Sequence, residues 1–184
     1  WGQNKVQELS RGMQQKVQLI ASLIHDPELV VLDEPFQGLD PVNAEMVREM
    51  IHELRSRGKT ILLSAHEMSL VEMLCERIAL IDHGRVVLNG RLEEIKAQFA
   101  PNAILISPPL PLEGWPEVGR VEQHNGQQTV YLAGQTAPRD LLRRICNEGF
   151  SVDHFEKATV TLDEVFITVV KNPALHQTGQ VEHE

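Results

Sequence analysis

The stretch Leu29-Val-Val-Leu-Asp-Glu-Pro35 runs four apolar residues directly into two adjacent carboxylates. An unbroken apolar run of this length is typical of a strand buried on both faces in a parallel sheet. Pro35 cannot donate a ladder hydrogen bond, so the strand is predicted to end at or near Glu34. Asp33 and Glu34 would then lie at the edge where open parallel sheets bind ligands. Two ionised groups there favour a metal ion or proton transfer, although a strand that simply ends in exposed charge is an open alternative.

A second apolar run, Ile61-Leu-Leu-Ser-Ala-His66, also ends in polar residues. The segment between the two runs has the features of an amphipathic helix. Asp40 suits its N-cap, Pro41 its first position, and Gly58 the position just after its C-terminus. Its apolar residues recur at helical spacing on one face: Val42, Met46, Val47, Met50, Ile51 and Leu54. A strand, a helix and a strand of these lengths predict a parallel crossover unit.

His66 would emerge at the same edge of the sheet as Asp33 and Glu34 if the two strands are neighbours. Such a group fits phosphoryl transfer, because one acid can hold a metal ion, the other can activate a water, and the imidazole can contact the phosphate. The residues alone therefore favour an α/β fold with an enzyme site at the carboxyl ends of two parallel strands.

Four short motifs resemble those of ATP-binding-cassette (ABC) ATPases, in the family's order and spacing. Leu9-Ser-Arg-Gly-Met13 is similar to the family's signature Leu-Ser-Gly-Gly-Gln, with Arg and Met where Gly and Gln are usual. Residues 29–34 resemble the Walker B strand, Gly38-Leu-Asp40 the D-loop, and His66 the switch histidine. The resemblance implies the C-terminal part of a P-loop (ABC-type) ATPase domain with a parallel sheet core, which binds and hydrolyses ATP.

The same resemblance implies roles for individual residues. Asp33 would hold Mg²⁺ through water, and Glu34 would be the general base that orients the attacking water. His66 would contact the γ-phosphate of the nucleotide. The implied cofactors are therefore ATP and Mg²⁺.

Five more residues are assigned to nucleotide binding by the resemblance: Ser10, Arg11, Gly12, Gly38 and Asp40. Ser10 and Gly12 would grip a γ-phosphate held by a partner subunit, and Asp40 would act across the dimer interface. A helix beginning at Ser10 suits this role, since the free N–H groups of a helix N-terminus bind phosphate. Ser10 also fits an ordinary helix cap.

The implied partners are a second ABC ATPase subunit, in a homodimer or a pair, and a membrane permease. Closure of the ATP-bound dimer would power export, with the ATPase held at the cytoplasmic face of the cell membrane through the permease. The formal charge of −9 argues against a nucleic-acid partner, because phosphate binding needs a basic surface. Two alternatives stay open: an ABC ATPase that does not act in transport, and a non-catalytic regulatory or interaction fragment.

The motif Gly-x-x-x-x-Gly-Lys-Ser/Thr does not occur in the 184 residues, so they lack the phosphate-binding loop of a P-loop ATPase. We therefore expect the chain to be the C-terminal portion of a longer ATPase polypeptide. We also expect these residues alone to be inactive toward ATP.

The chain is predicted to contain an ATPase portion over 1–100, a small α+β domain over 101–171 and a flexible tail over 172–184. Four prolines between 108 and 116 follow the first boundary. The second domain is predicted to have strands at 118–123, 128–133 and 150–155 and helices at 138–146 and 162–170, compatible with a split βαβ arrangement. Its stretch Thr161-Leu-Asp-Glu-Val-Phe166 resembles the C-terminal extension of ABC ATPases that serve drug exporters.

Two further expectations concern packing. The helix that begins at Ser10 is predicted to bury one apolar stripe, formed by Met13, Val17, Ile20 and Ile24. The two cysteines, Cys75 and Cys146, lack metal or redox spacing and are predicted to be reduced, packed thiols.

Overall fold

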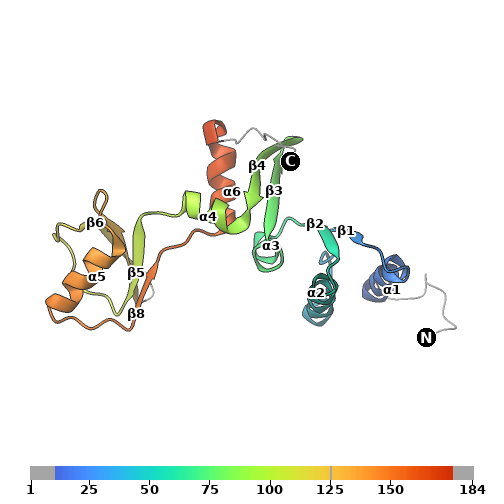
Figure 1. Ribbon diagram of the computed structural model, residues 1–184, viewed down its shortest axis with the longest axis horizontal. Coiled ribbons are helices and arrows are strands. Elements are labelled where there is room, and N and C mark those ends of the chain that lie inside the picture. Colours follow the sequence, from blue (N-terminus) through green and yellow to red (C-terminus); the bar gives the residue numbers. More distant parts are fainter. Residues whose placement is uncertain (1–10, 125, 176–184) are drawn as a thin grey trace. The chain divides into compact units, whose positions relative to one another are not determined.

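The computed structural model describes residues 11–124 and 126–175. Contacts between residues divide the chain into two compact units, with the division between Glu76 and Arg77. The chain contains both helices and strands, so the predicted mixed α/β character is confirmed (Figure 1). Each unit is described separately below.

The first unit contains the predicted crossover. Its elements are α1 (Arg11–Leu23), β1 (Leu29–Asp33), α2 (Pro41–Ser56), β2 (Thr60–Ser64) and α3 (Met68–Leu74). Strands β1 and β2 lie side by side in Figure 1 and pair in parallel, in a register that runs from Leu29 opposite Thr60 to Asp33 opposite Ser64. This register places the polar ends of both strands at one edge of the sheet.

The ends of α2 agree with the sequence prediction. Asp40 is the N-cap and accepts a hydrogen bond from the backbone N–H of Asn43 at 3.0 Å, with Pro41 at the first helical position. At the other end Gly58 takes a φ of +79°, a left-handed conformation that glycine adopts at little steric cost. On the helix itself, Val47, Ile51 and Leu54 are buried.

The prediction that β1 is buried on both faces is wrong. Val30 and Leu32 are buried, whereas Leu29 and Val31 are 55% and 64% exposed. Leu62 on β2 is likewise 61% exposed. Side chains alternate between the two faces of a strand, and the described residues of this unit pack their core against only one face. The apolar run therefore predicted the strand correctly but not the exposure of its side chains.

The predicted apolar stripe of α1 is also wrong. Leu19 of this helix is buried and Leu23 packs against the same core, while Ile20 and Ile24 are 65% and 82% exposed. The helical period offers two overlapping apolar stripes in this sequence, and contact with the neighbouring elements selects between them. Val42, predicted on the apolar face of α2, is likewise exposed.

The second unit begins with an antiparallel hairpin. Strand β3 (Arg77–Asp82) pairs with β4 (Arg85–Arg91) through a turn in which His83 is 90% exposed, and α4 (Leu92–Phe99) follows directly. Ile95 on α4 is buried.

A four-stranded antiparallel sheet follows, in the order β6-β7-β5-β8. Its elements are β5 (Ala103–Ser107), β6 (Val118–His124), β7 (Gln127–Leu132), α5 (Pro138–Asn147) and β8 (His154–Lys157). Since β5 pairs antiparallel to both β7 and β8, those two strands run in the same direction on either side of it. With α5 connecting them, they form the predicted split βαβ arrangement.

Two parts of this sheet differ from the prediction. Strand β5 was missed, although its residues Ile104 and Ile106 are fully buried at the centre of the sheet. The strand expected over 150–155 is in fact β8, which begins only at His154. Phe150 and Val152 precede it as irregular backbone and pack against the core. Strand β5 was missed because prolines lie on both sides of it. The strand at 150–155 was predicted too long because Phe150 and Val152 are apolar residues of a loop.

The core of this sheet includes one buried polar side chain, Gln128 on β7. Its Oε1 accepts a hydrogen bond from the backbone N–H of Leu110 at 3.0 Å, and its Nε2 donates to the backbone O of Leu110 at 2.8 Å. Gln128 thereby binds both backbone polar groups of Leu110 in the proline-rich segment, and the Leu110 carbonyl oxygen also accepts from the N–H of Leu112 at 2.9 Å.

Helix α6 (Leu162–Lys171) contacts α4 and β4. It begins with a capping box, in which Thr161 caps the backbone N–H of Glu164 and the Glu164 carboxylate accepts from the Thr161 N–H. Figure 1 shows this helix beside β4. Helix α6 was assigned to the predicted second domain, but it packs on α4 and β4, which were assigned to the predicted first domain. The domain boundary at 100/101 stays a prediction.

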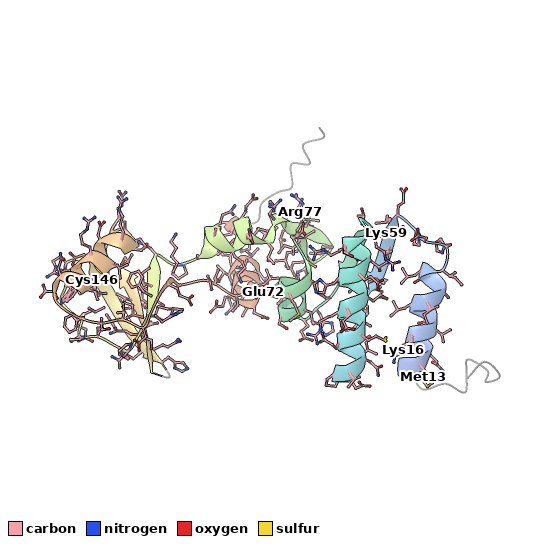
Figure 2. All side chains as sticks on the ribbon, turned by 60° about the horizontal axis from the view of Figure 1, so that its bottom comes forward. Met13, Lys16, Lys59, Glu72, Arg77 and Cys146 are labelled. Carbon is pink, nitrogen blue, oxygen red and sulfur yellow. The ribbon has the colours of Figure 1, made fainter. Side chains whose placement is uncertain are left out.

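The remaining expectations concern the tail and the cysteines. Pro173–Leu175 form a 3-10 helix, and the rest of the predicted tail lies outside the described residues. Cys146 on α5, labelled in Figure 2, is exposed, so its predicted packing is wrong, whereas Cys75 is half-buried. Burial raises the pKa of the Cys75 thiol. None of the helices in the described ranges is long and apolar enough to span a bilayer.

Candidate functional site

Asp33, Glu34, Ser64 and His66 meet where β1 and β2 end. Asp33 is the last residue of β1 and lies opposite Ser64, the last residue of β2. The chain continues from each strand into an irregular segment that carries Glu34 on one side and His66 on the other. The predicted convergence of Asp33, Glu34 and His66 at one edge of the sheet is therefore present in the fold.

Glu34 and His66 are in direct contact. The Nδ1 of His66 lies 2.9 Å from the Oε1 of Glu34. Glu34 is half-buried, with 32% of its side chain exposed, whereas 73% of the His66 side chain is exposed. The acid thus contacts one ring nitrogen of His66, and most of the ring is open to solvent.

The backbone of Glu34 is in an uncommon conformation. Its φ is +45°, in the left-handed region that residues with a side chain seldom occupy. Its N–H is directed at Ser64, 3.2 Å from the carbonyl oxygen and 3.0 Å from Oγ. The hydroxyl of Ser64 in turn donates to Oδ1 of Asp33. Strained residues held by their surroundings are a frequent feature of functional sites.

Sequence reasoning did not select Ser64. The available signal was its place in the second strand, two residues before His66 and at the polar end of an apolar run. A hydroxyl at that point faces the same edge as the acids only if the two strands end in register. The register is a tertiary property, and it places Ser64 opposite Asp33 in the candidate site.

The contact with Glu34 has an electrostatic consequence for His66. The hydrogen bond and the charge of Glu34 raise the pKa of His66 above its ordinary value. A raised pKa means that the contact stabilises the protonated imidazole. Its contribution to folding stability is complete below the ordinary pKa and disappears as the pH rises through the raised value.

Replacement of Glu34 by glutamine is therefore expected to lower the pKa of His66 toward the ordinary histidine value. The titration can be followed by the ring carbon and proton resonances of His66 in NMR spectra recorded across the pH range. His83 provides an internal control, since its pKa is raised by Asp82 and should not respond. An unchanged His66 titration would show that the Glu34 contact is not formed in solution.

The predicted D-loop residues lie at the start of α2. Gly38 takes a φ of +73°, and the Asp40 carboxylate accepts hydrogen bonds from both the backbone N–H and the side-chain amide of Asn43. These bonds hold the pKa of Asp40 below its usual value. Asn43, which sequence reasoning also missed, therefore fixes the orientation of Asp40.

Only part of the predicted signature can be described. Ser10 lies outside the described residues, as does the side chain of Arg11. Gly12 lies in the first turn of α1, and a Cβ built there would come within 3.3 Å of the side-chain nitrogen of Asn43. Absence of a side chain at Gly12 thus allows α1 to approach the N-terminus of α2 closely.

A magnesium ion is compatible with this arrangement. Among the described residues, histidine, cysteine and acidic side chains do not gather in groups of three or more that could hold a metal. Mg²⁺ commonly keeps several waters and is held by one or two carboxylates together with substrate phosphates. Asp33 offers a hard oxygen donor of this kind in an exposed position at the strand end.

Comparison with known proteins shows which families the chain resembles. Residues 90–170 match the model of the C-terminal domain of ATP-binding proteins like DrrA1-3, and residues 5–72 match an AAA domain described as a putative AbiEii toxin of a type IV toxin–antitoxin system. An ABC transporter ATP-binding protein of Alkalihalophilus pseudofirmus, itself uncharacterized, is 38% identical over 90% of the chain. Over most of its length the chain is therefore similar to ABC transporter ATP-binding proteins.

Other ABC proteins match shorter parts. A fluoroquinolones export ATP-binding protein of Mycobacterium tuberculosis is 45% identical over 50% of this chain and 30% of its own length. A solved ATP-binding subunit of an ABC transporter has 36% identity and a TM-score of 0.48, over 51% of this chain and 39% of that one. The chain spans 63% of the Alkalihalophilus relative, so it corresponds to part of that ABC protein.

Proposed function

We propose that this chain supplies part of the ATP-hydrolysing site of an ABC exporter. The carrying observation is that Asp33, Glu34 and His66 lie together at the carboxyl ends of two parallel strands, with the Glu34 carboxylate 2.9 Å from the imidazole. Enzymes that transfer phosphoryl groups act mainly by positioning and by electrostatic stabilisation, for which this arrangement is suited.

Asp33 is proposed to hold Mg²⁺ through water. A bound Mg²⁺ would neutralise charge on the β- and γ-phosphates of ATP. The contribution of the protein is to fix the Asp33 carboxylate at the strand end, where the Ser64 hydroxyl binds one of its oxygens. This leaves the carboxylate oriented before the nucleotide arrives, which lowers the cost of binding.

Glu34 is proposed to be the general base. Its carboxylate would accept a hydrogen bond from the attacking water and orient that water toward the γ-phosphate. His66 would donate a hydrogen bond to the γ-phosphate from Nε2, because its Nδ1 is held by Glu34. The raised pKa of His66 supports this role, since a protonated imidazole stabilises negative charge on the phosphate.

The remaining residues are proposed to act across a pair of ATPase subunits. Ser10, Arg11 and Gly12 would meet the γ-phosphate held by the partner subunit, helped by the N–H groups at the start of α1. Gly38 and Asp40 would form the adjoining contact, with Asp40 held in place by Asn43. ATP would thus bind between two subunits and promote their association.

Export through a membrane permease is the proposed use of this hydrolysis. Support comes from the match of residues 90–170 to the DrrA1-3-like C-terminal domain and from the fluoroquinolones export protein among the relatives. The ATPase would then lie at the cytoplasmic face of the membrane, attached through the permease.

The experiment that tests this function is the Mg²⁺ dependence of ATP hydrolysis by the full-length protein. We expect hydrolysis to require Mg²⁺, and Asp33→Asn to lower it by about 100-fold at a fixed Mg²⁺ concentration, because a neutral amide holds a magnesium-bound water less strongly than a carboxylate does. Asp82→Asn is the matched control, since Asp82 lies in the β3–β4 hairpin. Mg²⁺-independent hydrolysis, or equal activity of Asp33→Asn and wild type, would contradict the assignment.

A further inference from the structure

The side chain of Ser64 joins the two acids of the candidate site. Its hydroxyl donates a hydrogen bond to Oδ1 of Asp33 and accepts one from the backbone N–H of Glu34 at 3.0 Å. The carbonyl oxygen of Ser64 lies 3.2 Å from the same N–H. One residue of β2 therefore contacts the carboxylate of one acid and the backbone of the next.

The two bonds constrain each other. A serine hydroxyl has a single donor, so donation to Asp33 fixes the direction in which its lone pairs point. One lone pair then meets the N–H of Glu34, whose φ of +45° is sparsely populated and has to be held by neighbouring groups. The conformation of Glu34 decides where its carboxylate points, and in this fold it points to Nδ1 of His66.

We propose that Ser64 is a positioning residue, whose hydroxyl orients the Asp33 carboxylate and holds the Glu34 backbone in the conformation that brings the Glu34 carboxylate to His66. The inference rests on the proposed function in assigning catalytic importance to Asp33 and Glu34. In this role Ser64 acts through the two acids.

A pair of isosteric variants separates the hydroxyl from the shape of the side chain. Ser64→Thr keeps the hydroxyl. Ser64→Val introduces a side chain with the same branched shape as threonine but without the hydroxyl. Ser64 is exposed at the end of β2, so either β-branched side chain has room and suits a strand. Thr60→Val makes the same chemical change at the opposite end of β2, next to Leu29, and is the control.

The first measurement is steady-state ATP hydrolysis by the full-length protein. We expect Ser64→Val to lower kcat by about tenfold or more with little change in KM, because misaligned acids impair the transition state more than nucleotide binding. Ser64→Thr and Thr60→Val should stay close to wild type. A merely structural role would not produce rescue by threonine together with a selective loss of kcat.

The second measurement does not depend on activity. Hydrogen exchange of the Glu34 amide, read by NMR, should be about tenfold faster in Ser64→Val than in wild type, and near the wild-type rate in Ser64→Thr. Circular dichroism verifies that the variants are folded, and Ser64→Ala replaces Ser64→Val if the latter is not.

The outcomes distinguish this inference from the proposed function. Equal kcat and equal exchange in Ser64→Val and wild type would overturn the role of Ser64, even if Glu34→Gln is inactive. Equal impairment of the valine and threonine variants would also overturn it, because shape would then be the cause. If the wild type does not hydrolyse ATP, the proposed function is wrong, and unchanged exchange of the Glu34 amide in Ser64→Val would separately overturn the positioning role.

Discussion

Glu34→Gln is expected to lower the rate of ATP hydrolysis by about 10²–10⁴-fold, the range contributed by a positioned general base. Glutamine has nearly the same shape as glutamate but cannot take a proton from water. Nucleotide binding should be preserved, because the carboxylate acts on the water and not on ATP. If subunits pair around ATP, the variant should accumulate as a nucleotide-bound dimer, which size-exclusion chromatography with ATP would detect.

The matched control is Glu49→Gln on α2, which removes one negative charge from an exposed position of the same unit. Hydrolysis by this variant should match wild type. Glu34→Gln with wild-type hydrolysis would rule out the assignment of Glu34 as the base. Loss of nucleotide binding with unchanged hydrolysis per bound ATP would place Glu34 in binding instead.

Gln128→Leu is expected to destabilise the second unit by about 3 kcal/mol. The substitution removes both hydrogen bonds to the backbone of Leu110 and leaves its buried N–H without this partner, whereas its C=O still accepts from the N–H of Leu112. Gln128 is 1% exposed, so water cannot replace the lost bonds without opening the core. Urea unfolding followed by circular dichroism would measure the loss, with hydrogen exchange at the Leu110 amide as the local readout.

Gln127→Leu provides the control for this prediction. Gln127 is the preceding residue of β7 and is exposed, so the same chemical change should alter stability by less than about 0.5 kcal/mol. If the two leucine variants unfold at the same urea concentration, the Gln128 bonds to Leu110 do not contribute to stability.

Much of the candidate site could be predicted from the sequence because its parts carry local chemistry. Asp33 and Glu34 directly follow an apolar run and precede Pro35, and His66 follows a second run. The ends of α2 were likewise predictable, since the cap at Asp40 and the left-handed Gly58 depend on neighbouring backbone alone. Such features need only a few consecutive residues to be recognised.

Other features could not be predicted because several segments determine them together. The burial of α1 through Leu19, and not through Ile20 and Ile24, depends on which stripe meets the core. Strand β5 lies in a proline-rich neighbourhood, and its position at the centre of the sheet depends on pairing with β7 and β8. The role of Gln128 could not be predicted either, because it depends on the position of Leu110 in the folded chain.

Short-range patterns were enough to predict the two strands, the helix between them and the chemical types at their ends, because hydrophobic period, capping residues and proline act over short distances. The folded chain was needed to show that Asp33 lies opposite Ser64, that one hydroxyl contacts both acids, and that Glu34 contacts His66. Those relations follow from strand register and from a left-handed backbone at Glu34. Both arise when distant segments satisfy each other's hydrogen bonds, a condition that short-range sequence patterns do not contain.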